Sequence, residues 1–152
     1  MLQETPPAEW TATESGGETK VSALLQGRRV IICEDEAVIQ VQLNRILSLA
    51  GLEVVARCVD GKDGVEMTCE LKPDIVLMDL NMPKIDGMEA ARRIIEDCRP
   101  CVVIISAYGD AEFRKRAREI GVCGYITKPI ASDSLITQLE SIYSDFGTKS
   151  AS

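Results

Sequence analysis

Residues 74–83 read Asp74-Ile75-Val76-Leu77-Met78-Asp79-Leu80-Asn81-Met82-Pro83, an apolar run that ends at a carboxylate and passes into a turn. A short, continuous apolar run is typical of a strand that is buried on both faces. In parallel α/β folds, ligands bind in the crevice at the carboxyl ends of such strands. Asp79 is therefore the first candidate for a reactive side chain.

Two other apolar runs end in polar side chains in the same way. Glu34 and Asp35 follow one run, and Lys128 with Pro129 follows another. If the strands are parallel neighbours, three carboxylates and an ammonium group share one crevice. Two like charges about 4 Å apart repel by about 4 kcal/mol at an effective dielectric constant of about 20, so the cluster requires a cation. Oxygen ligands in a chain with no histidine favour Mg²⁺ over zinc.

Length and composition indicate one acidic globular domain. The chain has 152 residues, of which 45% are hydrophobic, enough for a single core. A net charge of −7 and a pI near 4.7 argue against general binding to DNA or to an anionic membrane surface. The sequence contains no apolar run of about 20 residues and no signal-peptide pattern, so we expect a cytoplasmic protein with reduced cysteines.

From Arg28 onward, runs of strand length alternate with segments of helical period, which predicts five βα units and a parallel sheet. The clearest helical face carries Ile39, Leu43 and Ile46, with Gly51 at the position of a C-terminal cap. Right-handed crossovers then give a doubly wound three-layer α/β sandwich of flavodoxin-like order 2-1-3-4-5. The predicted strands are 29–33, 53–58, 74–78, 101–106 and 124–127.

The predicted topology and the predicted chemistry indicate the same place. In this strand order the direction of winding reverses between the first and third strands. Those strands end at Glu34-Asp35 and at Asp79, so the acids lie where such sheets bind ligands.

Residues 1–27 are predicted to be a mobile acidic extension, because they are rich in proline, glycine, glutamate and small polar residues. A helical turn over 21–26, stopped by Gly27, is possible within it, and Trp10 is either a docking anchor or incidental. The domain itself is predicted over 28–146, and residues 147–152 are predicted to be a short tail.

Several of these features together resemble the receiver domain of bacterial two-component response regulators, over about residues 28 to 146. Each feature alone is weak, because a lone acid after a strand is more often a cap and a lone lysine is more often solvated. Their joint order on matching elements is specific. The residues that carry the resemblance are Glu34-Asp35, Asp79, Met82-Pro83, Asp86-Gly87, Ser106-Ala107, Tyr125 and Lys128-Pro129.

The resemblance implies that Asp79 accepts a phosphoryl group from a sensor histidine kinase or a histidine phosphotransfer protein. It also implies Mg²⁺ held by Asp35, by Asp79 and by the backbone carbonyl of Asn81, with Glu34 acting through water. The chain is then a signalling protein that catalyses only its own phosphorylation and dephosphorylation.

The same resemblance assigns a switch. Lys128, followed by Pro129, supplies a fixed positive charge, and the Ser106 hydroxyl donates a hydrogen bond to the phosphoryl group. The loop that starts at Ala107 then moves, and Tyr125 swings inward. Ser106 replaces the commoner threonine and lacks its methyl group, and the alternative for Tyr125 is a plain core aromatic.

The output is expected to leave by protein contact, through the fourth helix, the strand 124–127 and the last helix, to a partner or to a second copy. The basic run Arg114-Lys115-Arg116 in that helix has glutamates at i,i+4 spacing, which favours a solvated face over nucleic-acid binding. The alternative is a receiver fragment of a larger regulator with a missing DNA- or RNA-binding output domain.

Three further readings are less favoured. A phosphatase of the haloacid dehalogenase type requires a second aspartate as general acid two residues after the nucleophile, and this chain has Asn81 at that position. A pseudo-receiver would not need its intact acids and lysine. A redox or metal site at Cys98-Arg99-Pro100-Cys101 is disfavoured because Cys98 falls at the end of a helix and the chain has no histidine.

Overall fold

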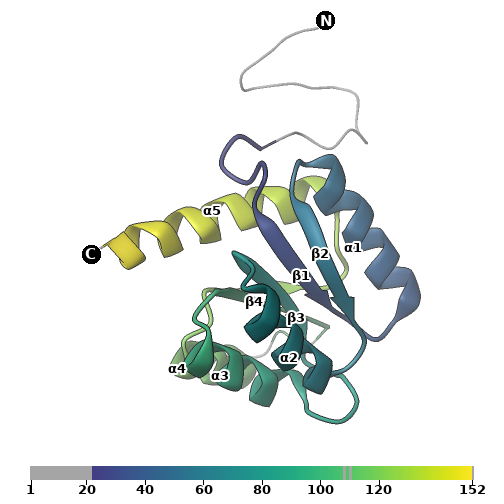
Figure 1. The fold of residues 1–152 in the computed structure, drawn as a ribbon, viewed down its shortest axis with the longest axis vertical. Helices are drawn as coiled ribbons and strands as arrows, with labels where there is room; N and C mark the ends of the chain where they lie inside the picture. The colour runs from purple at the N-terminus through teal and green to yellow at the C-terminus, as the bar shows by residue number, and fades with distance from the viewer. Residues whose placement is uncertain (1–21, 108, 110, 152) are drawn as a thin grey trace, which may run out of the picture.

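The computed structural model describes residues 22–107, 109 and 111–151, in which strands alternate with helices (Figure 1). The third strand reaches one residue further than predicted and includes Asp79. The strands are β1 (Arg29–Cys33), β2 (Glu53–Cys58), β3 (Ile75–Asp79), β4 (Cys101–Ser106) and β5 (Gly124–Thr127). The helices are α1 (Ala37–Leu49), α2 (Gly61–Leu71), α3 (Gly87–Asp97), α4 (Ala111–Ile120) and α5 (Ser132–Ala151).

The five strands form one parallel sheet in the order β2-β1-β3-β4-β5, which confirms the predicted topology. Helices cover both faces. The side chains of α1 and α5 pack into one core cluster, and those of α2, α3 and α4 pack into the other. The described helices include none with the length and apolar character needed to cross a membrane.

The strand β3 explains how the two cores are filled. Ile75 and Leu77 belong to the cluster under α1 and α5, whereas Val76 and Met78 belong to the cluster under α2, α3 and α4. This alternation follows from the two-residue period of a strand. All five residues of β3 are buried, so Asp79 comes out of the core at the carboxyl edge of the sheet.

The N-terminal boundary was predicted too late in the chain. Leu25 is fully buried in the core cluster of α1 and α5, and the backbone N–H of Gly27 donates to the Gly51 carbonyl over 2.8 Å. The Ser22 hydroxyl also donates to Glu140 Oε2 over 2.7 Å. Residues 22–27 therefore form a packed turn, because an apolar side chain anchors them. The predictions for Trp10 and for the rest of residues 1–21 lie outside the described residues.

The C-terminal boundary also differs from the prediction. The helix α5 continues through Ala151, where a tail from residue 147 was expected. A glycine inside a helix costs about 1 kcal/mol relative to alanine, and without a proline nearby it does not have to end the helix. Gly147 lies within α5, and Figure 1 shows this helix reaching well past the sheet.

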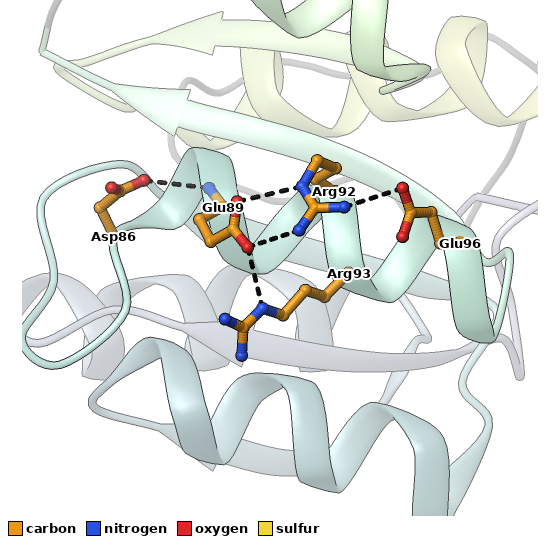
Figure 2. A network of polar contacts seen from close by, with 5 residues as sticks. All are labelled: Asp86, Glu89, Arg92, Arg93 and Glu96. Carbon is orange, nitrogen blue, oxygen red and sulfur yellow. Dashed lines mark hydrogen bonds and ion pairs between the residues drawn. The ribbon is translucent and has the colours of Figure 1, made fainter.

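The exposed face of α3 carries a network of paired charges (Figure 2). Glu89 accepts hydrogen bonds from Arg92 Nη2 over 2.6 Å and from Arg93 Nε over 2.9 Å, and Arg92 Nη1 donates to Glu96 over 2.8 Å. Arg92 and then Arg93 hold the pKa of Glu89 down at about 2. Asp86 caps the same helix by accepting from the Glu89 N–H over 3.0 Å. The network thus extends along α3 from its cap at Asp86 to Glu96.

Candidate functional site

The structure brings the predicted strand-end residues together. One carboxylate oxygen from each of Glu34, Asp35 and Asp79 lies within 4.8 Å of the others. Lys128, at the end of β5, reaches across β4 so that its Nζ lies 2.9 Å from Glu34 Oε1 and 3.7 Å from Asp79 Oδ1. These groups come from the ends of three strands and occupy one pocket at the carboxyl edge of the sheet.

Glu34 forms the floor of this pocket. Its side chain is 1% exposed, and its Oε2 accepts the backbone N–H of Glu36 over 3.1 Å. Its Oε1 is buried, and its partner is the Lys128 ammonium group, whose Nζ lies 2.9 Å away. Glu34 therefore contributes a buried carboxylate that is paired with Lys128.

Crowding and burial make the ionised form of Asp79 unfavourable. Two carboxylates 4.8 Å apart repel by about 3 kcal/mol at an effective dielectric constant of about 20. Burial and then the charge of Glu34 raise the pKa of Asp79 to about 6, although Lys128 and the Asn81 N–H act in the opposite direction.

Lys128 balances only part of this negative charge. Burial lowers the pKa of Lys128, but the hydrogen bond and charge of Glu34 and the charge of Asp79 raise it further, so the net shift is upward. Its Nζ also lies 3.8 Å from Glu36 Oε1. Three carboxylates thus pair with one ammonium group, and Asp35 lies beside two of them, so the pocket retains a net negative charge.

The residues present fit Mg²⁺. The donor set consists of carboxylate oxygens from Glu34, Asp35 and Asp79, and Mg²⁺ prefers oxygen ligands and keeps several waters. Asp35 is exposed, which leaves room for those waters. Asn81 is exposed and its N–H lies 3.4 Å from Asp79 Oδ1, whereas the use of its carbonyl as a ligand stays a prediction.

Comparison with known proteins assigns the fold and this pocket to a family. A family model described as the response regulator receiver domain matches residues 30–140, which include all the residues of the pocket. The chain belongs to the response regulator receiver family.

Curated relatives of this receiver differ in length. It is 38% identical over 119 residues to the transcriptional regulatory protein PdtaR of Mycobacterium tuberculosis, covering 78% of this chain and 58% of that protein. It is 39% identical over 117 residues to the chemotaxis protein CheY of Treponema pallidum, covering 75% of this chain and 81% of that protein. The receiver thus spans about three fifths of the length of PdtaR.

Solved receivers share the fold. The structure of the CheX–CheY–BeF3–Mg complex from Borrelia burgdorferi superposes with a TM-score of 0.75 at 27% identity. The match covers 78% of this chain and 90% of that one. Together with the family match, this likeness accounts for the strand order.

The loop between β3 and α3 is held in place by contacts that the sequence analysis missed. A side chain at Gly87 would collide with the Asp79 carbonyl, and one at Gly61 would collide with the Ile85 carbonyl. Lys84 Nζ also pairs with Asp60 Oδ2 over 3.4 Å. The start of α2 therefore braces the loop that follows Asp79. The pair Asp60-Gly61 was a visible turn signal, but nothing in the sequence connected it to this loop.

The predicted switch residues lie on the neighbouring strands of the receiver. Ser106 ends β4 and is 1% exposed, and its carbonyl accepts the Lys128 N–H over 2.8 Å. Ala107 is the first exposed residue after it, and Pro129 is exposed beyond Lys128. Tyr125 is half-buried on β5, where it pairs in register with Ile104.

Arg114 makes contacts that its place in a basic run did not suggest. Its guanidinium carbon lies 4.6 Å from the centre of the Tyr125 ring. Its Nη2 donates to Thr127 Oγ1 over 2.8 Å, and its Nε donates to the Gly109 carbonyl over 3.1 Å. Arg114 therefore joins α4 to β5 and to the loop after β4, and it covers one side of Tyr125.

Gln40 is a second residue that the sequence analysis missed. Its Nε2 donates to the carbonyl of Glu34 over 3.0 Å and to that of Cys58 over 3.3 Å. A polar residue on the first turns of a helix carries no sequence signal for this role. Gln40 ties the backbone under Glu34 to the end of β2.

Proposed function

We propose that this receiver accepts a phosphoryl group on Asp79 from the phosphohistidine of a sensor histidine kinase or of a histidine phosphotransfer protein. The observation that supports the proposal most strongly is the buried Asp79 carboxylate between Glu34 and Lys128 at the carboxyl edge of the sheet. The protein is then a signalling module whose only chemistry is its own phosphorylation and dephosphorylation, and we infer that it works in the cytoplasm.

Each residue of the pocket has its own role in the proposed phosphoryl transfer. A carboxylate oxygen of Asp79 attacks phosphorus while the bond from phosphorus to the donor nitrogen breaks. Lys128 places a positive charge beside the oxygens that gain negative charge, and the Ser106 hydroxyl donates to another of them. Mg²⁺, when held by Glu34, Asp35 and Asp79, screens the repulsion between the two anions.

Phosphorylation is proposed to change the surface formed by α4, β5 and α5. Each charge-assisted hydrogen bond to the phosphoryl group contributes about 1.5 to 3 kcal/mol, and only the difference between the two states shifts the equilibrium. Movement of the loop after Ser106 pulls on Gly109, which Arg114 holds against β5. Arg114 thus opposes the inward swing of Tyr125, and a partner protein or a second copy reads the result.

The phosphodonor is proposed to dock beside α1. Val38 and Val41 are 81% and 57% exposed on this helix, although large apolar side chains usually avoid water. Val38 lies three residues after Asp35, on the first turn of α1. Val38→Asp should therefore slow phosphorylation by a histidine-phosphorylated donor protein and leave phosphorylation by acetyl phosphate unchanged.

The decisive experiment is incubation with Mg²⁺ and acetyl phosphate, followed by intact-mass measurement. The wild type should gain one phosphoryl group, and Asp79→Asn should gain none. Asp133→Asn, which removes the same charge from an exposed position on α5, should react as the wild type does. Equal labelling of Asp79→Asn and the wild type would reject the assignment of Asp79.

A second measurement separates phosphorylation from its output. Arg114→Ala should leave labelling of Asp79 intact and increase the change of Tyr125 fluorescence on addition of a beryllofluoride mimic. Arg114→Lys keeps the charge over the ring but loses the forked hydrogen bonds, so it should lie between the two. An unchanged fluorescence response in Arg114→Ala would show that Arg114 has no restraining role.

A receiver at one end of a longer regulator is the second candidate. It is favoured by PdtaR, a transcriptional regulatory protein of which this chain spans 58%. The size of the natural gene product distinguishes the two candidates, because an output domain adds a second folded unit. The proposed chemistry of Asp79 is the same in both.

A further inference from the structure

The six cysteines are all free thiols, and each lies against another cysteine. The C-x-x-C spacing drew attention to Cys98 and Cys101, but these two residues do not form one of the pairs. Cys101 starts β4 and enters the core, whereas Cys98 remains at the end of α3. The neighbouring pairs, in which one thiol perturbs the pKa of the other, are Cys33–Cys58, Cys69–Cys98 and Cys101–Cys123.

The pairs differ in their access to solvent. Cys33 and Cys58 are 1% and 3% exposed, and Cys101 is 0% exposed, so two of the pairs contain a thiol that solvent does not reach. Cys69 and Cys98 are both half-buried, and both line a pocket of about 520 Å³. A small oxidant therefore has a path to both members of this pair.

The pocket lies at the amino-terminal edge of the sheet, opposite Asp79. Cys69 is near the end of α2, and Cys98 is the C-terminal cap of α3, where its N–H donates to the Ile94 carbonyl over 2.8 Å. Tyr143 and Phe146 of α5 line the pocket with them. The thiol pair is thus separated from the acidic pocket by the length of the strands.

The surroundings of Cys98 favour its protonated form. Burial and then the neighbouring Cys69 thiol raise the pKa of Cys98 to about 12, and the charge of Asp97 adds to this while that of Lys72 opposes it. Cys98 therefore keeps its proton more tightly than an ordinary thiol does. Arg99 and Asp74 also line the pocket.

We propose that Cys69 and Cys98 form a reversible oxidation site that closes to a disulfide when a small hydroperoxide enters the pocket. The Cys69 sulfur attacks the terminal peroxide oxygen, the O–O bond breaks, and the leaving oxygen takes the thiol proton and departs as an alcohol, or as water when the oxidant is hydrogen peroxide, so that Cys69 becomes a sulfenic acid. The Cys98 sulfur then attacks the Cys69 sulfur, the S–O bond breaks, and water leaves. A thiol reductant returns both residues to thiols.

Forming the disulfide brings the sulfur atoms of Cys69 and Cys98 to about 2.05 Å from each other. Both residues lie at helix ends, where side-chain rotation and a small backbone movement are easier than inside a strand. The disulfide would tie the end of α2 to the end of α3 and enclose β3 in a covalent loop. The charge network of Figure 2 ends at Glu96, two residues before Cys98, so the bond can close without breaking it.

The test is to treat the whole chain with hydrogen peroxide and to count thiols in denaturant without reductant. The wild type should fall from six free thiols to four, with an intact mass lower by two hydrogen atoms. Peptide mapping should show a Cys69–Cys98 cross-link, and dithiothreitol should restore all six thiols. Cys69→Ser should form no such intramolecular disulfide.

Cys123→Ser is the matched control, because it removes another half-buried thiol from a different pair. It should still form the Cys69–Cys98 bond and fall from five free thiols to three. A cross-link that maps to Cys98–Cys101 or to Cys101–Cys123 in the wild type would overturn the proposal. So would oxygen addition to the wild type without a disulfide, and these two results do not depend on any variant folding.

Discussion

On the exposed face of α3, Glu89 and Glu96 each lie against a guanidinium, whereas at the carboxyl edge of the sheet three carboxylates gather around the ammonium group of Lys128. The pairing holds the pKa of Glu89 at about 2, and the crowding raises the pKa of Asp79 to about 6. The same residue types thus give opposite shifts. The charges of the first cluster are paired within it, whereas the second cluster holds more carboxylates than positive charges.

Removing the positive charge of Lys128 should have the largest effect on stability. Lys128→Ala leaves Glu34 and Asp79 buried without their ammonium partner, and breaking such a pair costs about 3 kcal/mol. The free energy of unfolding in urea at neutral pH, with EDTA present, should fall by this amount. A Lys84→Ala control, whose side chain is 63% exposed, should lose far less. Equal losses would mean that Lys128 is only a surface partner.

Removing the negative charge of Asp79 should instead increase the free energy of unfolding. The pKa of Asp79 is about 6 in the folded protein and ordinarily 3.8, so the folded state holds the proton more tightly. The free energy of unfolding should therefore decrease as pH rises from about 4 to about 6, by at most about 3 kcal/mol. Asp79→Asn should lack this decrease and be the more stable protein above pH 6 without Mg²⁺. Parallel pH profiles for the two proteins would contradict the raised pKa.

Adding Mg²⁺ should offset the repulsion among the carboxylates at the sheet edge and stabilise the protein. At a Mg²⁺ concentration about ten times the dissociation constant, binding raises the free energy of unfolding by about 1.4 kcal/mol. Glu34→Gln, which keeps the shape of the side chain, should bind Mg²⁺ more weakly and gain less. Calorimetric titration and thermal unfolding measure both effects. A gain that survives in Glu34→Gln would place the ion elsewhere.

The smallest effect is expected on α3. Glu89→Gln removes partners from Arg92 and Arg93, but these charges are exposed and screened by salt. The loss of stability should be smaller than in any variant above and should shrink in high salt. Because the pKa of Glu89 is lowered from 4.5 to about 2, its contribution is present above about pH 4.5 and disappears as pH falls toward 2. A loss as large as that of Lys128→Ala would remove the distinction between the clusters.

The sheet and the acidic pocket could be predicted because each depends on a local pattern. Continuous apolar runs fixed the strands, and the carboxyl ends of parallel strands meet at one edge, so Glu34, Asp79 and Lys128 had to converge. The reach of Lys128 across β4 followed from the resemblance to the family. The roles assigned to Asn81 and Ser106 stay predictions.

What escaped prediction depends on side chains that meet across long sequence separations. Arg114 looked like one member of a basic run, and only the packing of α4 on β5 places it over Tyr125. The proximity of Cys98 to Cys69 could not be predicted from the spacing of Cys98 and Cys101, because Cys101 starts a strand and is buried. Two local preferences were also overruled, since Leu25 anchors a polar segment and Gly147 does not end α5.

The turn over residues 22–27 sets a limit on how this protein can be trimmed for the laboratory. The family match covers only residues 30–140. Leu25 lies outside that range but is buried in the core cluster of α1 and α5. A fragment that starts at residue 30 would have a cavity at the position of Leu25. Loss of a buried leucine side chain lowers the free energy of unfolding by roughly 2 to 5 kcal/mol. A fragment for laboratory work should therefore include Ser22, whose hydroxyl donates to Glu140 beside the buried Leu25.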